Sequence, residues 1–497
     1  MNNVVTTAEH RVAALESAQD AARTSTWETF VIGSCLFAAL SWSFLASSGL
    51  IQWMDNGFLM LTASEGVFFP DVVDATFHPL YHVVTVFLFD VFGGYGVAYL
   101  NSFLMLPIAY VTYRLAQTVG LNRRYATIAA LGVVLVHSVF WVSTKIEVYG
   151  LHLLLVLTTY WFVFEDKIMA KGSLKILVVG VLTGFAATTH QLTFIVLSPL
   201  YLYLWQREGW RTVWTIPGFL LGMFPAYPAL LTKMLSGDDL FTLIRISLTG
   251  SGGTSVPGWE GALFRFDKML EEKKYVALVL VSLCGIGMLG LVRIPKGQKQ
   301  FTLWCAATFN LLFCVSYSLS DRFTFFLPGA AFYTLLGVAY IWRNHARHRF
   351  TSYATLALVL AHPLILTGTV VLADMGTINL PTHSVSLPYR NDVHYYLWPY
   401  VPDRSAEAFV LAYEAYIPQG SVVISDFTAW SALRAAQVTG HFLRREIVRC
   451  DDTHAAWPDM MYLVRKDYCG KYLQDYRIEQ AALGWIVFKQ QFSAAPS

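Results

Sequence analysis

Long apolar stretches recur along the first three quarters of this 497-residue chain. A helix needs about 20 consecutive apolar residues to cross the hydrocarbon core of a bilayer. Only 14% of the residues are charged, whereas soluble globular proteins carry about 25%. The sequence therefore predicts an α-helical polytopic membrane protein, with the lipid bilayer as one partner. It excludes a soluble enzyme and a nucleic-acid-binding protein.

Charge divides the chain into two parts. Residues 1–374 contain 45 charged positions, and the much shorter segment 375–497 contains 23. The tail also lacks long apolar runs, so we predict a transmembrane domain over 27–374 and a small, exported α/β domain over 375–497. The segment 1–26 is polar and Ala-rich, which is typical of a cytoplasmic segment that precedes a signal anchor and not of a cleavable signal peptide.

The transmembrane domain is expected to contain about eleven spans. The run Val83–Phe92 is too short to cross the membrane and carries Asp90, so we expect it to lie as a helix in the outer interface. The expected spans are near 29–53, 97–117, 125–142, 150–164, 176–188, 192–205, 213–234, 275–292, 301–318, 323–342 and 351–373.

The loops on the two sides differ in charge. With the N-terminus inside, five cytoplasmic loops hold 13 Lys and Arg against two acids, and the opposite loops hold seven basic and 13 acidic residues. This is the bias of the positive-inside rule, and it predicts that the C-terminus faces outside. The compact cytoplasmic loops suit a bacterial inner membrane, where the outer side is the periplasm. The cytoplasmic loops are 120–125, 166–175, 206–212, 293–300 and 342–350, and the outer loops are 55–96, 143–149, 235–275 and 319–322.

Cysteine usage fits this topology. Cys450 and Cys469 are the two cysteines of the expected exported domain, and an oxidising compartment would let them pair. The sequence leaves open whether they do. The other four cysteines lie in spans, where a thiol is usually a small apolar packing residue.

Ionisable side chains gather at the outer ends of the spans. Such groups are costly at bilayer depth, so they are candidates for function. For any single one, the alternative is an ordinary loop residue, a helix cap, a structural imidazole or a local ion pair. The candidates come from five separate segments: Asp55, Glu65, Asp71, Asp74, His78, His82, Lys145, Glu147, Tyr149, His190, Asp321 and Arg322.

This inventory suits one kind of chemistry. A reaction at the outer interface cannot draw on cytosolic nucleotide-sugars, so its activated donor must be lipid-borne. A polyprenyl-phosphate sugar has a phosphate leaving group that needs no general acid, while the acceptor hydroxyl needs a carboxylate base. Cations would hold the phosphate. No cofactor is required, and acids such as Asp55 and Glu65 leave a divalent metal open.

The chain resembles the GT-C superfamily of polyprenyl-phosphate-sugar glycosyltransferases, in particular membrane proteins akin to protein O-mannosyltransferases. The resemblance covers roughly residues 55–450. It is carried by Asp55-Asn56-Gly57, His78-Pro79-Leu80-Tyr81, Asn101-Ser102, Phe140-Trp141, Glu147-Val148-Tyr149-Gly150-Leu151, Gly184, His190, Pro199, Asp321, Phe326-Leu327-Pro328 and the segment 417–426.

The resemblance implies a GT-C fold in which Asp55 is the catalytic base of an inverting transfer. Two positions depart from the family pattern. Relatives often have an acid directly after the glycine, where this chain has Phe58, and a second proline where it has Leu80. The missing acid's role would then fall to Glu65, Asp71 or Asp74. The acceptor is a protein, lipid or glycan, between which the sequence does not choose.

Two further segments carry expectations. The Gly/Ser-rich stretch 250–258 of the loop 235–275 is flexible in isolation, and it is either a lid over the site or a plain connector. In the tail, short strands are expected at 421–425, 446–450 and 484–488, with helices near 428–438 and 455–466. This βαβ pattern predicts a small α/β layer that handles the acceptor or only packs.

Two other functions compete with the glycosyltransferase. A transporter or flippase of lipid-linked sugars would place ionisable residues near the bilayer midplane and often shows repeated halves, but here the acids lie at span ends and no repeat is visible. An inactive assembly factor that kept the fold is the other alternative, which Phe58 favours.

Overall fold

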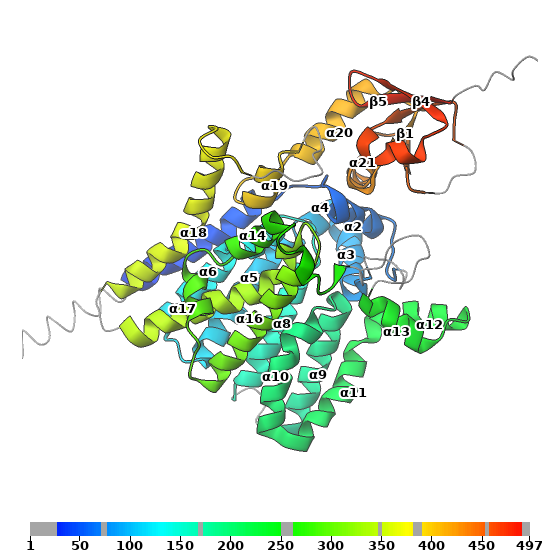
Figure 1. Cartoon of the computed structure of the whole chain (residues 1–497). Coiled ribbons are helices and arrows are strands. Elements are labelled where there is room, and N and C mark those ends of the chain that lie inside the picture. Colours follow the sequence, from blue (N-terminus) through cyan, green and yellow to red (C-terminus); the bar gives the residue numbers. More distant parts are fainter. Residues whose placement is uncertain are drawn as a thin grey trace, which may run out of the picture.

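The computed structural model describes residues 27–70, 77–166, 172–249, 262–345, 350–380, 390–452 and 457–489. A large bundle of helices carries a small five-stranded sheet at one end (Figure 1). The candidates Asp71 and Asp74 and the stretch 250–258 lie outside the described residues.

The helical bundle begins with the helix Trp27–Leu45. Its further helices are α2 (Met54–Ser64), α3 (Pro79–Phe92), α4 (Gly94–Ala98), α5 (Leu100–Thr118), α6 (Arg123–Leu135), α7 (His137–Ser143), α8 (Tyr149–Phe164), α9 (Gly172–Thr189), α10 (Thr193–Glu208), η1 (Gly209–Trp214), α11 (Thr215–Gly222), η2 (Phe224–Ala226), α12 (Tyr227–Leu235), α13 (Leu240–Thr249), η4 (Phe266–Lys268), α14 (Lys273–Val281), α15 (Ile286–Val292), α16 (Gln298–Ser316), η5 (Arg322–Phe326), α17 (Leu327–His345) and α18 (Thr351–Asp374).

The described helices confirm a polytopic membrane protein. Five helices are long and apolar enough to cross a membrane, and two pairs bent by 66° and 102° raise that number to up to seven. The expected spans 97–117 and 301–318 form α5 and α16, each of 19 residues. These two helices are not among the five that are long and apolar enough to cross a membrane. Eleven spans and the orientation of the chain stay predictions. The five helices are Trp27–Leu45, Gly172–Thr189, Thr193–Leu235, Arg322–His345 and Thr351–Asp374.

Small residues let the helices of the bundle approach closely. Gly180 and Gly184 of α9 face Gly218 and Gly222 of α11, and a Cβ at any of the four would collide with the backbone of the opposite helix. This is the small-xxx-small pattern that membrane helices use to pack backbone against backbone. The pattern fixes α9 and α11 as one rigid pair.

The C-terminal part is an α/β layer, as expected. It contains α19 (Asp392–Leu397), α20 (Ser405–Tyr416), β1 (Val422–Ser425), α21 (Phe427–Val438), β2 (Glu446–Arg449), β3 (Met460–Leu463), α22 (Lys466–Cys469), η6 (Gly470–Tyr472), β4 (Tyr476–Gln480) and β5 (Trp485–Lys489). The strand order is β2-β1-β3-β5-β4. The strands β2, β1 and β3 are parallel, and β5 pairs antiparallel with both β3 and β4.

The sheet confirms three expected strands and corrects one element. The strands β1, β2 and β5 lie where they were predicted, and β1-α21-β2 is the predicted βαβ unit. The helix expected near 455–466 is wrong, because Met460–Leu463 is the strand β3. A short apolar run such as Met460-Met461-Tyr462-Leu463 does not distinguish a strand from a buried helix by its periodicity.

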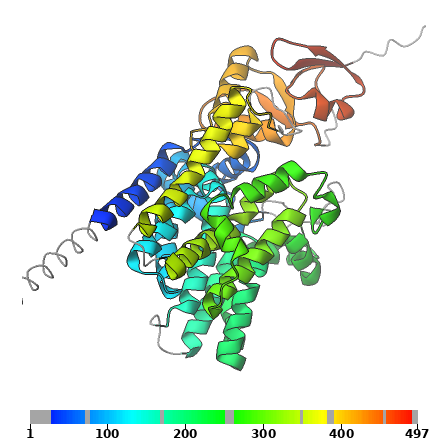
Figure 2. The ribbon, with the colours of Figure 1, turned by 60° about the vertical axis from the view of Figure 1, so that its left-hand side comes forward.

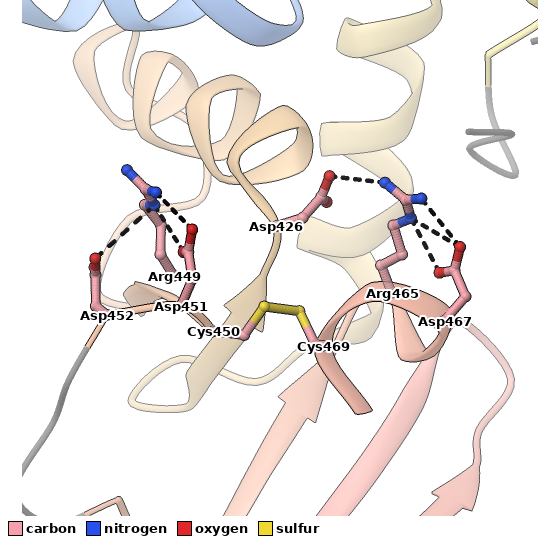
Figure 3. Close-up of a disulfide and its surroundings, with 8 residues drawn as sticks. All are labelled: Asp426, Arg449, Cys450, Asp451, Asp452, Arg465, Asp467 and Cys469. Carbon is pink, nitrogen blue, oxygen red and sulfur yellow. Dashed lines mark hydrogen bonds and ion pairs between the residues drawn. A yellow bond between two sulfur atoms is a disulfide. The ribbon is translucent and has the colours of Figure 1, made fainter. Parts of the chain in front are cut away.

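Cys450 and Cys469 form a disulfide, with their Cα atoms 5.5 Å apart. It joins the chain after β2 to α22, which follows β3, and so bridges the end of β1 that lies between them (Figure 3). The pairing that the sequence left open is thereby settled.

Candidate functional site

Asp55 lies in the first turn of α2, where a carboxylate is favoured by the helix dipole. The residue before it, Met54, has a φ of 56°, a left-handed conformation that non-glycine residues rarely adopt and that often marks a functional site. Trp53 anchors this start, because it is buried and its Nε1 donates to Ser405 Oγ at 2.8 Å. The local backbone therefore holds Asp55 in a defined position.

The helix α2 packs against α21 of the C-terminal part. Gly57 is required for this approach, since a Cβ there would lie 2.8 Å from the carbonyl oxygen of Ser431. Phe58 packs against Phe427 and Trp430, with ring centroids 5.9 and 6.1 Å apart. Phe58, the residue directly after Gly57, thus belongs to the contact between the two parts of the chain.

The loop between α7 and α8 is fixed by three amide side chains. Asn101 Nδ2 donates to the carbonyl oxygens of Lys145 and Glu147, at 2.9 and 2.6 Å. Asn56 Nδ2 donates to Ile146 O at 2.7 Å and to Glu147 Oε1 at 3.1 Å, and Gln52 Oε1 accepts from Ile146 N at 3.1 Å. The neighbour of Asp55 in sequence therefore bonds directly to Glu147.

Glu147 in this loop lies within electrostatic range of two other carboxyl groups, those of Asp55 and Asp321. Burial raises the pKa of Glu147 well above its ordinary value, and the nearby Asp55 and Asp321 raise it further. Burial also raises the pKa of Asp321. Tyr149 lies within electrostatic range of all three and hydrogen-bonds to Thr324, whose hydroxyl donates to the Asp321 carbonyl at 2.9 Å. The structure thus brings Asp55, Glu147 and Asp321 together from α2, the α7–α8 loop and the turn before η5.

Imidazoles form a second group beside the carboxyls. The ring of His190 lies 5.4 Å from His78, 5.7 Å from His152 and 5.2 Å from Tyr149, between centroids. Burial lowers the pKa of both His78 and His190 well below its ordinary value, and imidazole neighbours lower each further. These two rings are therefore neutral at physiological pH. His82 is also buried, on α3.

The two candidate cations bond elsewhere. Lys145 Nζ contacts Asp403 Oδ2 at 3.3 Å and Ser48 Oγ at 2.6 Å, and it lies over the ring of Tyr395 at 4.6 Å. Burial lowers its pKa, against the opposing effect of Asp403. Arg322 forms an ion pair with Glu272, whose other oxygen accepts from Ser318 Oγ at 2.6 Å. Lys145 therefore ties the membrane domain to the C-terminal part, and Arg322 ties down the end of the loop 235–275.

Glu65 also faces the C-terminal part. Its carboxylate lies 3.3 Å from Arg434 Nη2 of α21. Glu65 therefore belongs to the same contact between α2 and α21 as Gly57 and Phe58, and it is not part of the group formed by Asp55, Glu147 and Asp321. Among the described residues, no three His, Cys, Asp or Glu side chains are arranged to hold a metal ion.

The sequence reasoning missed two residues that shape the site. His152 completes the imidazole group, and Asp403 receives Lys145. The crowding of Tyr and Trp over 388–404 was a usable signal, because Tyr395 is buried and its hydroxyl donates to Asn56 Oδ1 at 3.3 Å. Gly150 has a packing role that its sequence motif does not reveal, because a Cβ there would collide with Asn101, which holds the α7–α8 loop.

No protein-family model and no curated protein sequence matches this chain. Among solved structures, it is similar to ArnT from Cupriavidus metallidurans. The TM-score is 0.58 at 11% identity for ArnT bound to undecaprenyl phosphate, over 94% of this chain and 100% of that one. For the apo state the TM-score is 0.59 at 12% identity, over 94% and 99%. The chain therefore has the expected GT-C membrane fold.

Proposed function

We propose that this GT-C-fold protein is a membrane glycosyltransferase that transfers a sugar from a polyprenyl-phosphate donor to an acceptor hydroxyl, with Asp55 as the base. The convergence of Asp55, Glu147 and Asp321 from three distant segments carries this proposal. The similarity in fold to ArnT, which was crystallised with undecaprenyl phosphate, supports a donor of that class. The mannosyl specificity of the family stays a prediction.

The surroundings of the three carboxyl groups favour one of them, Asp55, as the general base. Glu147 is buried, and its raised pKa disposes it to keep its proton, as the raised pKa of Asp321 does for that carboxyl. Asp55 and Asp321 are both half-buried, so an acceptor can reach either, and we assign the base to Asp55 because burial holds the pKa of Asp321 up.

The reaction then follows in one displacement. An Asp55 oxygen accepts the proton of the acceptor hydroxyl while the acceptor oxygen bonds to the anomeric carbon of the sugar. The bond between that carbon and the phosphate oxygen breaks, and its electron pair leaves with the lipid phosphate. Attack from the face opposite the phosphate inverts the anomeric configuration. Lys145 and Arg322 are already paired with Asp403 and Glu272, so they stabilise the framework of the site in this proposal.

The test compares wild type with Asp55→Asn in detergent. Each protein is incubated with a panel of radiolabelled polyprenyl-phosphate sugars and membrane extract, and both released polyprenyl phosphate and transferred sugar are measured. Loss of a general base should lower turnover about a hundredfold or more, with donor binding retained. Asp90→Asn on the exposed side of α3 is the matched control and should keep wild-type turnover.

Two results would contradict the proposal. Equal turnover by wild type and Asp55→Asn would remove Asp55 from the chemistry. Binding of a donor by wild type without any turnover would indicate a carrier of lipid-linked sugars or an inactive relative.

A further inference from the structure

We infer that the end of the C-terminal sheet where β1, β2 and β3 finish is a binding site for a neutral carbohydrate, centred on Asp426. The inference rests on the proposed function in one respect, since it takes this carbohydrate to be the acceptor. It assigns a ligand to the C-terminal α/β layer, for which the sequence left two roles open: binding the acceptor or only packing against the membrane helices.

The topology of the sheet places the site. The chain leaves β1 through α21 toward β2 on one side, and it leaves β3 through α22 toward β4 on the other. Open α/β sheets bind ligands outside the carboxyl ends of parallel strands where the connections diverge in this way. Asp426 follows β1 directly, and Arg465 follows β3 two residues after its last residue.

The polar groups at this edge are buried, and some of them lack a hydrogen-bond partner. Asp426 is 4% exposed, and its Oδ2 accepts from Arg465 Nη1 at 2.9 Å. Its other oxygen, Oδ1, is buried without a hydrogen-bond partner, and so is the hydroxyl of the preceding Ser425. Asp426 also precedes α21 without capping it. A buried oxygen that lacks a partner is costly, and a ligand hydroxyl would satisfy it.

Two guanidinium groups lie on either side of Asp426 (Figure 3). Arg465 bonds to Asp426 and Asp467, and Arg449 bonds to Asp451 with Nη2 at 2.7 Å from Oδ2. The disulfide Cys450–Cys469 joins the two segments that carry these arginines. Arg449 is partly exposed and pairs with acids of its own loop, so part of its guanidinium is open to a ligand at this edge.

The charges at the edge favour a neutral ligand. Each arginine is already neutralised by an aspartate next to it in the fold, so little positive charge remains to attract a phosphate. Planar acid and guanidinium groups can instead bond the paired hydroxyls of a sugar. Phe427 is half-buried at this edge, and the Arg449 guanidinium lies 5.5 Å from its ring centroid. The ring adds apolar surface beside the polar groups, and sugars present apolar C–H faces to such rings.

The site is next to the catalytic helix. Phe427 and Trp430, in the first turn of α21, pack against Phe58, which lies three residues after Asp55 on α2. A carbohydrate held at Asp426 would therefore extend from the α21 end of this contact toward α2. This also gives Phe58 a use, because it couples the sheet edge to the helix that carries the base.

The test measures binding directly. Saturation-transfer difference NMR is recorded on the full chain in detergent with methyl α-mannoside, methyl β-galactoside and methyl β-N-acetylglucosaminide as probes. Wild type should transfer saturation to at least one glycoside. Asp426→Asn and Arg449→Gln should each weaken that binding about tenfold, the scale of one lost hydrogen bond to a charged group. Glu479→Gln, an exposed acid on β4, is the matched control and should bind as wild type.

Further arms separate this inference from the proposed function. Asp55→Asn should bind the glycoside normally while it fails to transfer sugar. The carbohydrate site and the proposed transferase function can therefore fail independently of each other. If Asp426→Asn does not fold, Arg449→Gln still tests the site, because its side chain is partly exposed. Wild-type binding by both edge variants, no binding by wild type, or displacement of the glycoside by inorganic phosphate would each overturn the inference.

Discussion

At the scale of single residues, the burial of Glu147 among other carboxyls makes stability depend on pH. Its raised pKa means that the native protein keeps a proton that the unfolded chain has released. Above about pH 4, where a free glutamate ionises, the unfolded state binds fewer protons than the native state, so the free energy of unfolding falls as the pH rises.

Glu147→Gln should remove this part of the pH dependence. The variant keeps an oxygen for Asn56 Nδ2 but has no proton to lose. Its midpoint of thermal unfolding in detergent should match wild type near pH 4 and exceed it by an increasing margin up to pH 8. Glu479→Gln, whose carboxylate is exposed, should follow the wild-type curve. A margin that shrinks with rising pH would contradict the assignment.

The sequence could predict which acids are costly but not which partners they have. Asp55, Glu147 and Asp321 stand out because they interrupt apolar segments, and the structure brings these three together. The partners of Lys145, Arg322 and Glu65 are Asp403, Glu272 and Arg434. These partners lie on other elements far along the chain, so only the tertiary fold selects them.

At the scale of elements, close backbone contact between α9 and α11 predicts a sharp sensitivity to added volume. Gly222→Ala places a methyl group against the backbone of Val181, and backbone atoms cannot move aside as a side chain can. Overpacking of this kind should cost about 2 kcal/mol or more, measured as a lower unfolding midpoint. Gly368→Ala on α18 meets no atom within 4 Å and should not lower it, so equal loss in both variants would refute the contact.

Elements with a strong period were easier to predict than short ones. The βαβ unit of β1, α21 and β2 could be predicted because β1 is a β-branched apolar run and β2 has the apolar pair Ile447-Val448 at its centre. The strand β3 was mistaken for a helix, and β4, with the sequence Tyr-Arg-Ile-Glu-Gln, was missed. The strand β4 lies at the edge of the sheet and is mostly exposed. Its alternation of apolar and polar residues, Tyr-Arg-Ile-Glu, covers only four residues, which is the shortest run that identifies a strand.

At the scale of the whole molecule, the C-terminal part lies against one end of the helical bundle (Figure 2). Lys145 and Asp403 join these two parts. Asp403→Asn leaves a buried ammonium group unpaired, which should cost about 3 kcal/mol. Lys145→Met should cost less, because Asp403 is partly exposed and still accepts from Ser405 N at 3.0 Å. The double variant should be more stable than the sum of the two losses implies. Simple additivity of the three unfolding midpoints would show that the pair contributes no coupling.

The contact between α2 and α21 has a consequence for biogenesis. The helix α2 lies near the start of the chain, whereas α21 and the disulfide partner Cys469 lie near its end. A growing chain emerges from its N-terminus, so the membrane helices can associate while the surface around Phe58 is still bare. That surface is covered only when the last segment has been synthesised and has folded onto it. A nascent or truncated chain would therefore carry Asp55 on a helix whose packing partner α21 is still missing, so the surroundings of Asp55 are completed only at the last stage of folding.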